Sequence, residues 1–462
     1  MKIEPQYFSY KDSDAYVVKS NKGFIRHIFF QYKSQYNHLM LSGLYNQLVQ
    51  EGLLISHQEL VFETDDANVH KTILPEQIQF ISYPFEWSFL QWKKTALAFL
   101  RINQIALKYG MILKDASPYN FYLKEGKAIL FDTTSFAFFQ ENGSWLGYRQ
   151  FCEIIFAPIS LMKYNGSNWA KLYMSSLKGY SMKFVSKQLP LSSWFNISCL
   201  IHIHLHALYE TKKVAKSDKQ KGFSIAQLNQ LFQLLYSTID SWKNPTLATP
   251  IWLNYYSNDI EEPRYLNVKE ELIKDWLLLI KSDSLIDLGA NTGRFSVIAS
   301  KLVNRVIATD FDENCVDVIE SIIENNKLKN INALVIDLSE TSPSLGILNK
   351  EIPSFIERGK SDVVMALALV HHLSISNNLP FKHIADLFSC LSKRYLIVEF
   401  IPREDSKVQL LLKNRENAFP NYTEEIFRDN LSKWFKLIDR KVLKPSKRTL
   451  YLWEKKEEFI NE

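Results

Sequence analysis

The chain has 462 residues, 46% of them hydrophobic, and a net charge of +5 at neutral pH. This length suits two or three domains with sizeable cores. The mild positive charge, without clusters of Lys and Arg interleaved with aromatic residues, gives no indication of nucleic acid as a partner. No apolar run approaches a membrane span and the first residues lack a signal core, so we expect a cytoplasmic protein. Four cysteines without C-x-x-C spacing predict a reduced chain with no metal site.

The first half of the chain alternates between strand-like and helix-like patterns. Apolar spacing predicts three strands, at residues 23–30, 77–83 and 127–131. It predicts helices between them, at residues 38–52 and 87–109. Between the second helix and the final strand lies the segment KDASPYN, residues 114–120, and the final strand leads directly into Asp132.

The spacing of Asp115, Asn120 and Asp132 resembles the catalytic loop of kinase-like folds. That resemblance implies that one Asp orients an acceptor hydroxyl, while Asn120 and Asp132 hold magnesium. The chain departs from the pattern, because no Gly-rich phosphate loop precedes these residues and only Arg26 is a candidate phosphate partner. A degenerate kinase-like scaffold with a remnant of a nucleotide and magnesium site is therefore favoured. An active phosphotransferase and a coincidental spacing in an unrelated fold are the alternatives.

The second half begins with the most informative segment of the chain, DSLIDLGANTGRFS, at residues 283–296. An apolar run ends in Asp287, glycines follow at Gly289 and Gly293, and an amphipathic segment comes next. A strand that turns tightly into a helix beside a ligand needs this arrangement. A second apolar run ends in Asp310, which is the spacing of a carboxylate that binds a ribose at the next strand.

Further strand-like runs follow in order, separated by helical stretches. They span residues 333–337, 362–369 and 395–400, and two more at 436–443 and 448–453 surround a Lys-Pro-Ser-Lys turn. This order predicts an α/β fold, with a doubly wound parallel sheet and a terminal β-hairpin, preceded by an α+β kinase-like domain. We expect a kinase-like domain at 1–165, a mainly helical extension or linker at 166–250 and a second catalytic-type domain at 251–462.

This second half resembles class I S-adenosylmethionine-dependent methyltransferases. The resemblance rests on the D-L-G-x-x-x-G turn, Asp310, Asp337 and the segment ALVHHL, and it covers roughly residues 250–455. A nicotinamide-binding Rossmann domain is the competing interpretation, but its G-x-G-x-x-G pattern fails because position 291 is Asn.

The resemblance implies a role for each residue of the turn and of the following strands. Asp310 would accept both ribose hydroxyls, and Gly289, Asn291 and Gly293 would form the turn that leaves space for the amino-acid moiety. Asp287 would anchor the turn or the cofactor amine, with a turn-capping role as the alternative. Asp337 would bind the adenine amino group, with a helix N-cap before Ser339 as the alternative.

The chain as a whole resembles a bacterial family of two-part class I methyltransferases with an N-terminal kinase-like domain. The segments that carry this resemblance include ISYPFEW, LKDASPYNF, YRQFCEIIFAPISLM, ALALVHHLSISNN and VEFIPREDSKV. Some members carry the name nodulation host-specificity protein. Coverage is nearly the full length, and it adds little about the substrate.

Methyl transfer requires in-line approach of an acceptor, and a base only where the acceptor must lose a proton. His371 and His372 follow the fourth strand at the edge where α/β sheets bind ligands, and they are the candidate catalytic residues. Glu399 is a weaker candidate, and Arg403, Arg415 and Tyr422 are candidates for the acceptor pocket.

The sequence therefore predicts S-adenosylmethionine-dependent methyl transfer to a small-molecule or glycan acceptor. A bifunctional kinase–methyltransferase and a non-catalytic S-adenosylmethionine-binding scaffold are the alternatives. The oligomeric state leaves no signal in the sequence.

Overall fold

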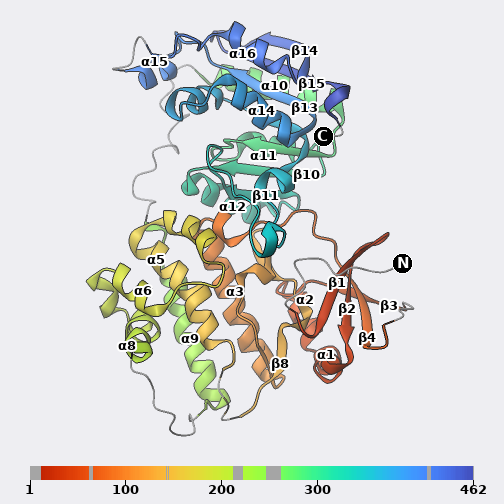
Figure 1. The fold of residues 1–462 in the computed structure, drawn as a ribbon, viewed down its shortest axis with the longest axis vertical. Coiled ribbons are helices and arrows are strands. Elements are labelled where there is room, and N and C mark those ends of the chain that lie inside the picture. Colours follow the sequence, from red (N-terminus) through yellow and green to blue (C-terminus); the bar gives the residue numbers. More distant parts are fainter. Residues whose placement is uncertain are drawn as a thin grey trace. The chain divides into compact units, whose positions relative to one another are not determined.

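The computed structural model describes residues 12–61, 66–141, 143, 145–211, 222–245, 262–413 and 418–460. The chain divides into two compact units, one of Met1–Ala248 with Leu345–Ile352 and one of Thr249–Ser344 with Pro353–Glu462. Figure 1 labels the elements of both units. Within the described ranges, no helix is both long and apolar enough to cross a membrane.

The first unit opens with a four-stranded antiparallel sheet in the order β1-β2-β4-β3, drawn in red in Figure 1. Two short antiparallel pairs, β5 with β8 and β6 with β7, follow. The strands of this unit are β1 (Ala15–Ser20), β2 (Gly23–Phe29), β3 (His57–Leu60), β4 (Val69–Pro75), β5 (Met111–Leu113), β6 (Phe121–Lys124), β7 (Lys127–Leu130) and β8 (Phe136–Phe138).

Helices make up most of the rest of the first unit. They are α1 (Lys33–Leu41), α2 (Leu44–Gln50), α3 (Phe89–Lys108), α4 (Tyr148–Gln150), α5 (Ala157–Asn165), α6 (Met182–Gln188), α7 (Ile197–Cys199), α8 (His206–Thr211) and α9 (Ile225–Ser241). The long helix α3 begins at a capping box in which Ser88 and Gln91 satisfy each other's backbone N–H groups. It packs against α9 and against β5, so it forms the centre of this unit.

Two expectations for the first unit are wrong. Residues 77–83 form no strand, although Phe80 is buried there, because a short apolar run satisfies burial in an irregular segment as well as in a strand. Residues 38–52 are not one helix, because Gly43 adopts a left-handed φ of 94° and separates α1 from α2. The strand β4 had no counterpart among the sequence predictions, whereas the long helix at 87–109 is confirmed as α3.

The second unit is built on a seven-stranded sheet in the order β11-β10-β9-β12-β13-β15-β14. The five strands from β11 to β13 are parallel, and β15 is antiparallel to both of its neighbours. The strands are β9 (Ser284–Leu288), β10 (Arg305–Asp310), β11 (Ile331–Val335), β12 (Ser361–Ala366), β13 (Ser392–Phe400), β14 (Phe435–Val442) and β15 (Thr449–Lys455).

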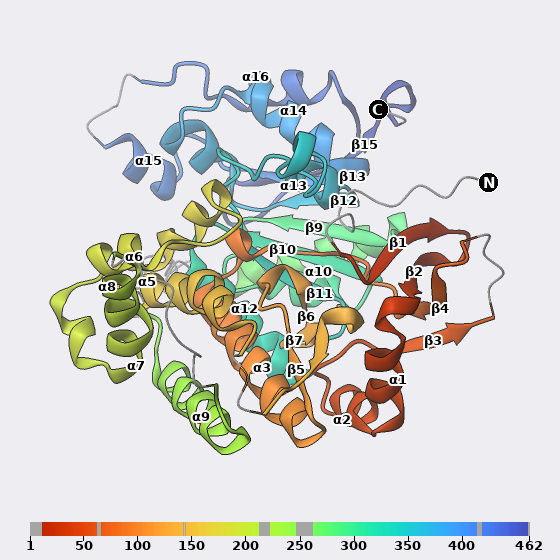
Figure 2. The ribbon, with the colours of Figure 1, turned by 60° about the horizontal axis from the view of Figure 1, so that its bottom comes forward.

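Helices cover both faces of this sheet (Figures 1 and 2). They are α10 (Glu262–Ile280), α11 (Arg294–Ala299), α12 (Glu313–Asn326), α13 (Phe355–Gly359), α14 (Phe381–Leu391), α15 (Ser406–Leu412) and α16 (Glu424–Leu431). Every residue of the central strand β9 is buried, and this explains the apolar run in its sequence. Leu285 joins the core under α10, α11 and α12, whereas Ile286 lies beside Gly359 at the end of α13.

The expected parallel sheet and terminal hairpin are confirmed in the second unit. The hairpin is inserted in reverse order, so that β15 lies between β13 and β14. The third parallel strand ends at Val335, two residues before the position that the sequence predicts. The consequence for the site is that β9, β10, β12 and β13 all end at the same edge of the sheet.

Candidate cofactor site

The turn between β9 and α11 has a backbone that only certain residues adopt readily. Gly289, Asn291 and Gly293 have positive φ angles of 71°, 51° and 79°. A Cβ on Gly293 would lie 2.8 Å from Cγ1 of Ile319, which is closer than packed carbon atoms approach. Glycine at 293 is therefore required both by its φ angle and by the contact with α12.

Asp310 ends the neighbouring strand β10, and its carboxylate is held by two backbone groups. The N–H of Asn291 donates to Oδ2 over 2.8 Å, and the N–H of Asp312 donates to Oδ1 over 2.9 Å. Burial raises the pKa of Asp310 to about 6. The turn after β9 and the end of β10 are thus joined through this side chain. Asp312 itself caps α12, since its side chain accepts the backbone N–H of Asn314.

Asp287 is buried on β9, two residues before the turn. Its Oδ2 accepts a hydrogen bond of 2.6 Å from the hydroxyl of Ser296 in α11. Burial raises its pKa to about 7, because the ionised form loses its hydration, while the bond from Ser296 and the charge of Lys269 oppose that rise. This edge of the sheet therefore holds two carboxyl groups whose ionisation is sensitive to whatever charge binds beside them.

Asp337 lies two residues beyond the end of β11 and is half-buried. Its Oδ1 accepts bonds from the backbone N–H and the hydroxyl of Ser339, at 3.0 and 2.6 Å. A turn follows Asp337 where the alternative interpretation expected a helix, so the residue stabilises a turn instead of capping a helix.

His371 and His372 follow β12 at the same edge of the sheet, with ring centroids 4.0 Å apart. His371 is completely buried, and neither of its ring nitrogens has a hydrogen-bond partner. Burial lowers the pKa of His371 well below its ordinary value and that of His372 to about 4. Both rings are therefore neutral at pH 7.

Glu399, the weaker candidate base, is committed to other contacts. It lies at the carboxyl end of β13 and forms a fully buried ion pair with Lys269 of α10, with 2.5 Å between Nζ and Oε2. The Tyr265 hydroxyl donates to its Oε1, and the backbone N–H of Ala368 donates to its Oε2. Although burial opposes ionisation, the charges of Lys269 and Arg448 lower the pKa of Glu399 below its ordinary value.

Sequence reasoning missed Lys269 and Arg448 in this cluster. One signal was present, since Lys269 occupies the same helical face as the buried Tyr265 and Ile273, four residues to either side. A lysine on the apolar face of a helix needs a buried partner.

The residues expected to line the acceptor pocket have other contacts or are not described. Arg403 donates to the carbonyls of residues 418 and 419, Tyr422 donates to the carbonyl of residue 401, and Arg415 lies outside the described residues.

The three residues of the kinase-like pattern come together in the first unit. Nδ2 of Asn120 donates to Asp115 over 3.0 Å and to Asp132 over 3.4 Å. Asp132 also forms a largely buried ion pair with Arg26, and it accepts bonds from Thr134 and Ser135. Burial opposes its ionisation, but the guanidinium of Arg26 outweighs this effect and lowers the pKa of Asp132 to about 2.

The Asp132 carboxylate is therefore already hydrogen-bonded by protein donors. Both of its oxygens receive bonds from side chains, and Oδ1 also receives the backbone N–H of Thr134. Across the described ranges, no group of three or more His, Cys, Asp and Glu side chains is placed to hold a metal ion.

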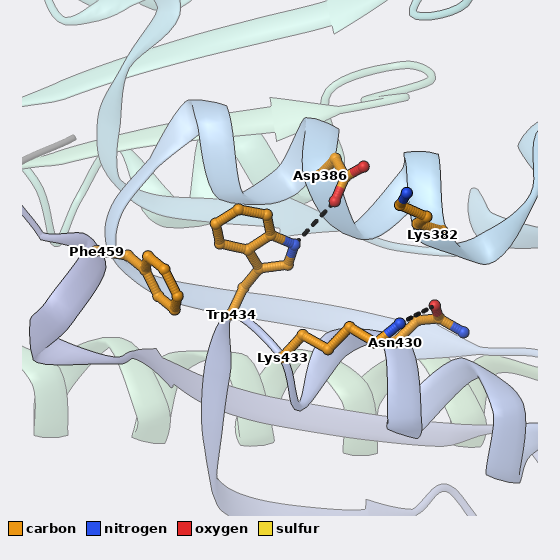
Figure 3. Close-up of a pocket in the computed structure, with 6 residues that line it drawn as sticks. All are labelled: Lys382, Asp386, Asn430, Lys433, Trp434 and Phe459. Atoms are coloured by element: carbon orange, nitrogen blue, oxygen red, sulfur yellow. Dashed lines mark hydrogen bonds between the residues drawn. The ribbon is translucent and has the colours of Figure 1, made fainter.

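A small cavity of about 140 Å³ lies on the second unit between α14, α16 and β14 (Figure 3). In it, Nε1 of Trp434 donates to Asp386 over 2.9 Å, and the Trp434 ring meets Phe459 edge-on. Trp434 precedes Phe435, which pairs with Lys455 of β15, and the neighbouring Glu454 pairs with Tyr395 in the first half of β13. The cavity is thus at the edge of the sheet opposite to the carboxyl groups of Asp287 and Asp310, and it is not part of the candidate cofactor site.

The chain is similar to several known proteins. The model of the family described as tellurite resistance protein TehB matches residues 254–346. The nodulation protein NoeA of Rhizobium meliloti (strain 1021) is 30% identical over 425 residues, which is 89% of this chain and 88% of that protein.

Two solved structures are similar over part of the chain. The N-methyltransferase NodS from Bradyrhizobium japonicum WM9, in complex with S-adenosyl-L-homocysteine, is 11% identical with a TM-score of 0.32, covering 43% of this chain and 90% of that one. The bifunctional kinase-methyltransferase WbdD is 19% identical with a TM-score of 0.30, covering 45% of this chain and 42% of that one. The identity to NoeA along nearly nine tenths of both chains is the finding that decides the family. The chain belongs to the bacterial protein family that includes the nodulation protein NoeA.

Proposed function

We propose that this protein transfers a methyl group from S-adenosylmethionine to a hydroxyl or amino group of a small-molecule or glycan acceptor. The observation that carries the proposal is the meeting of Asp287, the turn at 289–293 and Asp310 at the carboxyl edge of the parallel sheet. Open α/β sheets bind their ligands at this edge.

The residues present fit the cofactor chemically. Asp310 is ionised above pH 6 or so, and its carboxylate can accept two ribose hydroxyls while keeping its backbone bonds, since each oxygen has two lone pairs. Gly289 and Gly293 give the turn the left-handed backbone along which the amino-acid moiety would lie, and their missing Cβ atoms leave room for Leu369 and Ile319. Asp287 would ionise when a cationic amine comes near, and Asp337 would accept from the adenine amino group.

When bound, S-adenosylmethionine supplies an electrophilic methyl group on a positively charged sulfur. The protein's task is to exclude water and to hold the acceptor in line with that methyl group. The ring of His371 is buried beside His372 and neutral at pH 7, so an acceptor group that enters as far as this ring would be held by a hydrogen bond to its unpartnered nitrogen. An amine that enters in its neutral form would need only the hydrogen bond.

For the first unit, we propose a kinase-like scaffold that does not transfer phosphate. The support is the position of Arg26, whose guanidinium is paired with Asp132 where a magnesium ion would need that carboxylate. Asp115 and Asn120 would then hold the loop together through their mutual hydrogen bond.

Calorimetry of the full chain with S-adenosylmethionine tests the cofactor assignment. Asp310→Ala loses charge-assisted bonds to the ribose, so we expect its binding to weaken by about 2–4 kcal/mol. Asp312→Asn is the matched control, because it changes charge two residues away and retains a good helix cap. A folded Asp310→Ala variant that binds like wild type would contradict the proposal.

The acceptor is identified by methyl incorporation. Purified protein and labelled S-adenosylmethionine are incubated with cell extract, and the labelled product is characterised by mass spectrometry. Absence of any labelled product, with cofactor binding intact, would favour the non-catalytic scaffold.

A further inference from the structure

The loop after β12 is held by a side chain from the neighbouring strand. Ala368, two residues beyond β12, has a left-handed φ of 50°, which costs an alanine free energy. Its backbone N–H donates to Oε2 of Glu399 over 2.9 Å. This bond compensates the unfavourable backbone conformation, so the shape of the loop depends on Glu399.

Glu399 is in turn fixed by two side chains of α10, one of which is held by Arg448. Lys269 of α10 pairs with the same oxygen that receives the Ala368 N–H, and the Tyr265 hydroxyl donates to the other oxygen. Arg448, the residue before β15, contacts the Tyr265 hydroxyl at 3.4 Å and pairs with Asp405 through two bonds of 2.8 and 3.2 Å. A carboxylate that is buried and bonded from several sides has a single orientation.

The same loop contacts the turn of the candidate cofactor site. A Cβ placed on Gly289 would lie 3.0 Å from Cδ1 of Leu369, so the Leu369 side chain lies directly over this glycine. The carbonyl of Leu369 accepts the N–H of His372 over 3.0 Å, which begins the helical turn that carries the histidine pair. A shift at Ala368 would therefore move both the wall over Gly289 and the two imidazole rings.

The ammonium group of Lys269 that pairs with Glu399 also lies near the glycine turn. It is 4.9 Å from the ring centroid of Phe295, the second residue of the helix that follows this turn. The Lys269–Glu399 pair thus contacts two segments next to the glycine turn. Lys269 contacts Phe295 in the helix after the turn, and Glu399 binds Ala368 in the loop after β12.

We infer that Glu399 is a positioning residue for cofactor binding, which acts by holding the N–H of Ala368 and with it the Leu369 wall over Gly289. The inference rests on the proposed binding of S-adenosylmethionine at this edge. Glu399 touches neither reacting atom, and its effect passes through the loop.

Two double variants of the full chain test this inference. Lys269→Met with Glu399→Gln removes both buried charges and keeps an amide oxygen that accepts from Ala368, while the amide nitrogen faces the Tyr265 hydroxyl. Lys269→Met with Glu399→Leu removes the same charges and leaves the Ala368 N–H without that acceptor. The two proteins therefore differ in whether residue 399 keeps its bond to the loop and its contact with the Tyr265 hydroxyl. Adding Tyr265→Phe to both removes the second difference, and neither protein leaves a single buried charge unpaired.

The probe is S-adenosylhomocysteine, measured by calorimetry, together with the melting temperature and hydrogen exchange of the peptide that contains Ala368. We expect the Gln variant to bind within about threefold of wild type, and the folded Leu variant to bind about tenfold or more weakly, with faster exchange at this peptide. If the two variants bind S-adenosylhomocysteine with equal affinity, the inference is overturned. This holds whether both bind like wild type or both bind more weakly. A wild-type protein that binds no S-adenosylhomocysteine would instead refute the proposed function on which it rests.

Discussion

The backbone N–H of Asn291 donates to the carboxylate of Asp310, and this bond joins the glycine turn after β9 to the end of β10. The two residues are 19 positions apart in sequence and are brought together by the parallel pairing of the two strands. The bond leaves Asp310 ionisable but held in one orientation. The site is therefore organised before any cofactor arrives.

The ionisation of Asp287 predicts a pH-dependent stability. Its folded-state pKa of about 7 lies above the ordinary value of 3.8, so the folded chain retains a proton that the unfolded chain loses. The stabilisation is complete below pH 4 and is lost as the pH rises toward 7, by at most about 1.4 kcal/mol per pH unit. Asp287→Asn removes this dependence and keeps an oxygen for Ser296.

Denaturant unfolding of both proteins between pH 4 and pH 8 measures the effect. We expect Asp287→Asn to gain stability relative to wild type as the pH rises to about 7 and then to level off. A difference that stays constant across this range would contradict the prediction. Cofactor binding near pH 6.5 should also release a proton in wild type and less of one in the variant, as seen by calorimetry in buffers of different ionisation enthalpy.

Gly293→Ala should destabilise the second unit strongly. The new Cβ would lie 2.8 Å from Ile319, and the alanine would have to keep a φ of 79°. Overpacking and backbone strain together should cost about 2–4 kcal/mol. Gly110→Ala is the matched control, since Gly110 has a similar φ of 70° and open space around it. It should lose only about 1–2 kcal/mol, through strain alone.

Thermal and denaturant unfolding compare the two glycine variants. In a double-mutant cycle, Gly293→Ala should cost less in the Ile319→Ala background than in wild type, because the smaller side chain removes the overpacking and leaves the strain. Equal losses for Gly293→Ala and Gly110→Ala would show that the contact with Ile319 has no energetic role.

Arg26→Met should destabilise the first unit, because it leaves the largely buried carboxylate of Asp132 without its cation. The two side chains are 13% and 15% exposed, so the loss should approach but stay below the cost of about 3–5 kcal/mol for a fully buried pair. Arg101→Met is the control, since the Arg101–Glu51 pair lies at 3.2 Å on the surface and such pairs contribute about 0–1 kcal/mol. Similar melting temperatures for the two variants would contradict a structural role for Arg26.

The same reasoning predicts no response of the first unit to nucleotide. ATP with magnesium should leave the melting temperature of wild type unchanged, because Arg26 occupies the metal-binding carboxylate. A rise that is lost in Asp132→Asn, together with phosphate transfer, would support the bifunctional kinase–methyltransferase.

His371→Leu should separate function from stability. The His371 ring is buried with neither nitrogen bonded, so its removal should leave the free energy of unfolding unchanged or raise it by about 1 kcal/mol. Methyl incorporation in extract should nevertheless fall. His204→Leu is the contrasting variant, because both His204 nitrogens are bonded to serine hydroxyls over 2.8 Å, and it should destabilise the chain. Unchanged methyl incorporation in His371→Leu would remove the residue from the acceptor site.

The sequence alone determined the features that depend on local backbone requirements and on complete burial. The turn at 289–293 is visible because a left-handed backbone at Gly289 and Gly293 requires glycine. The parallel strands are visible because strands buried on both faces must be apolar along their whole length. The long helix α3 is visible because its cap and its apolar face repeat at fixed spacing.

The tertiary structure alone decided which charged residues meet. Lys269 and Glu399 are 130 positions apart, and Arg26 and Asp132 are 106 apart, so no local pattern connects either pair. Sequence spacing presented Asp132 as a metal ligand and Glu399 as a base, whereas folding surrounds each with a cation and hydrogen-bond donors. A carboxylate's chemistry is set by the groups within a few ångströms of it, and those neighbours are chosen by the packing of distant segments.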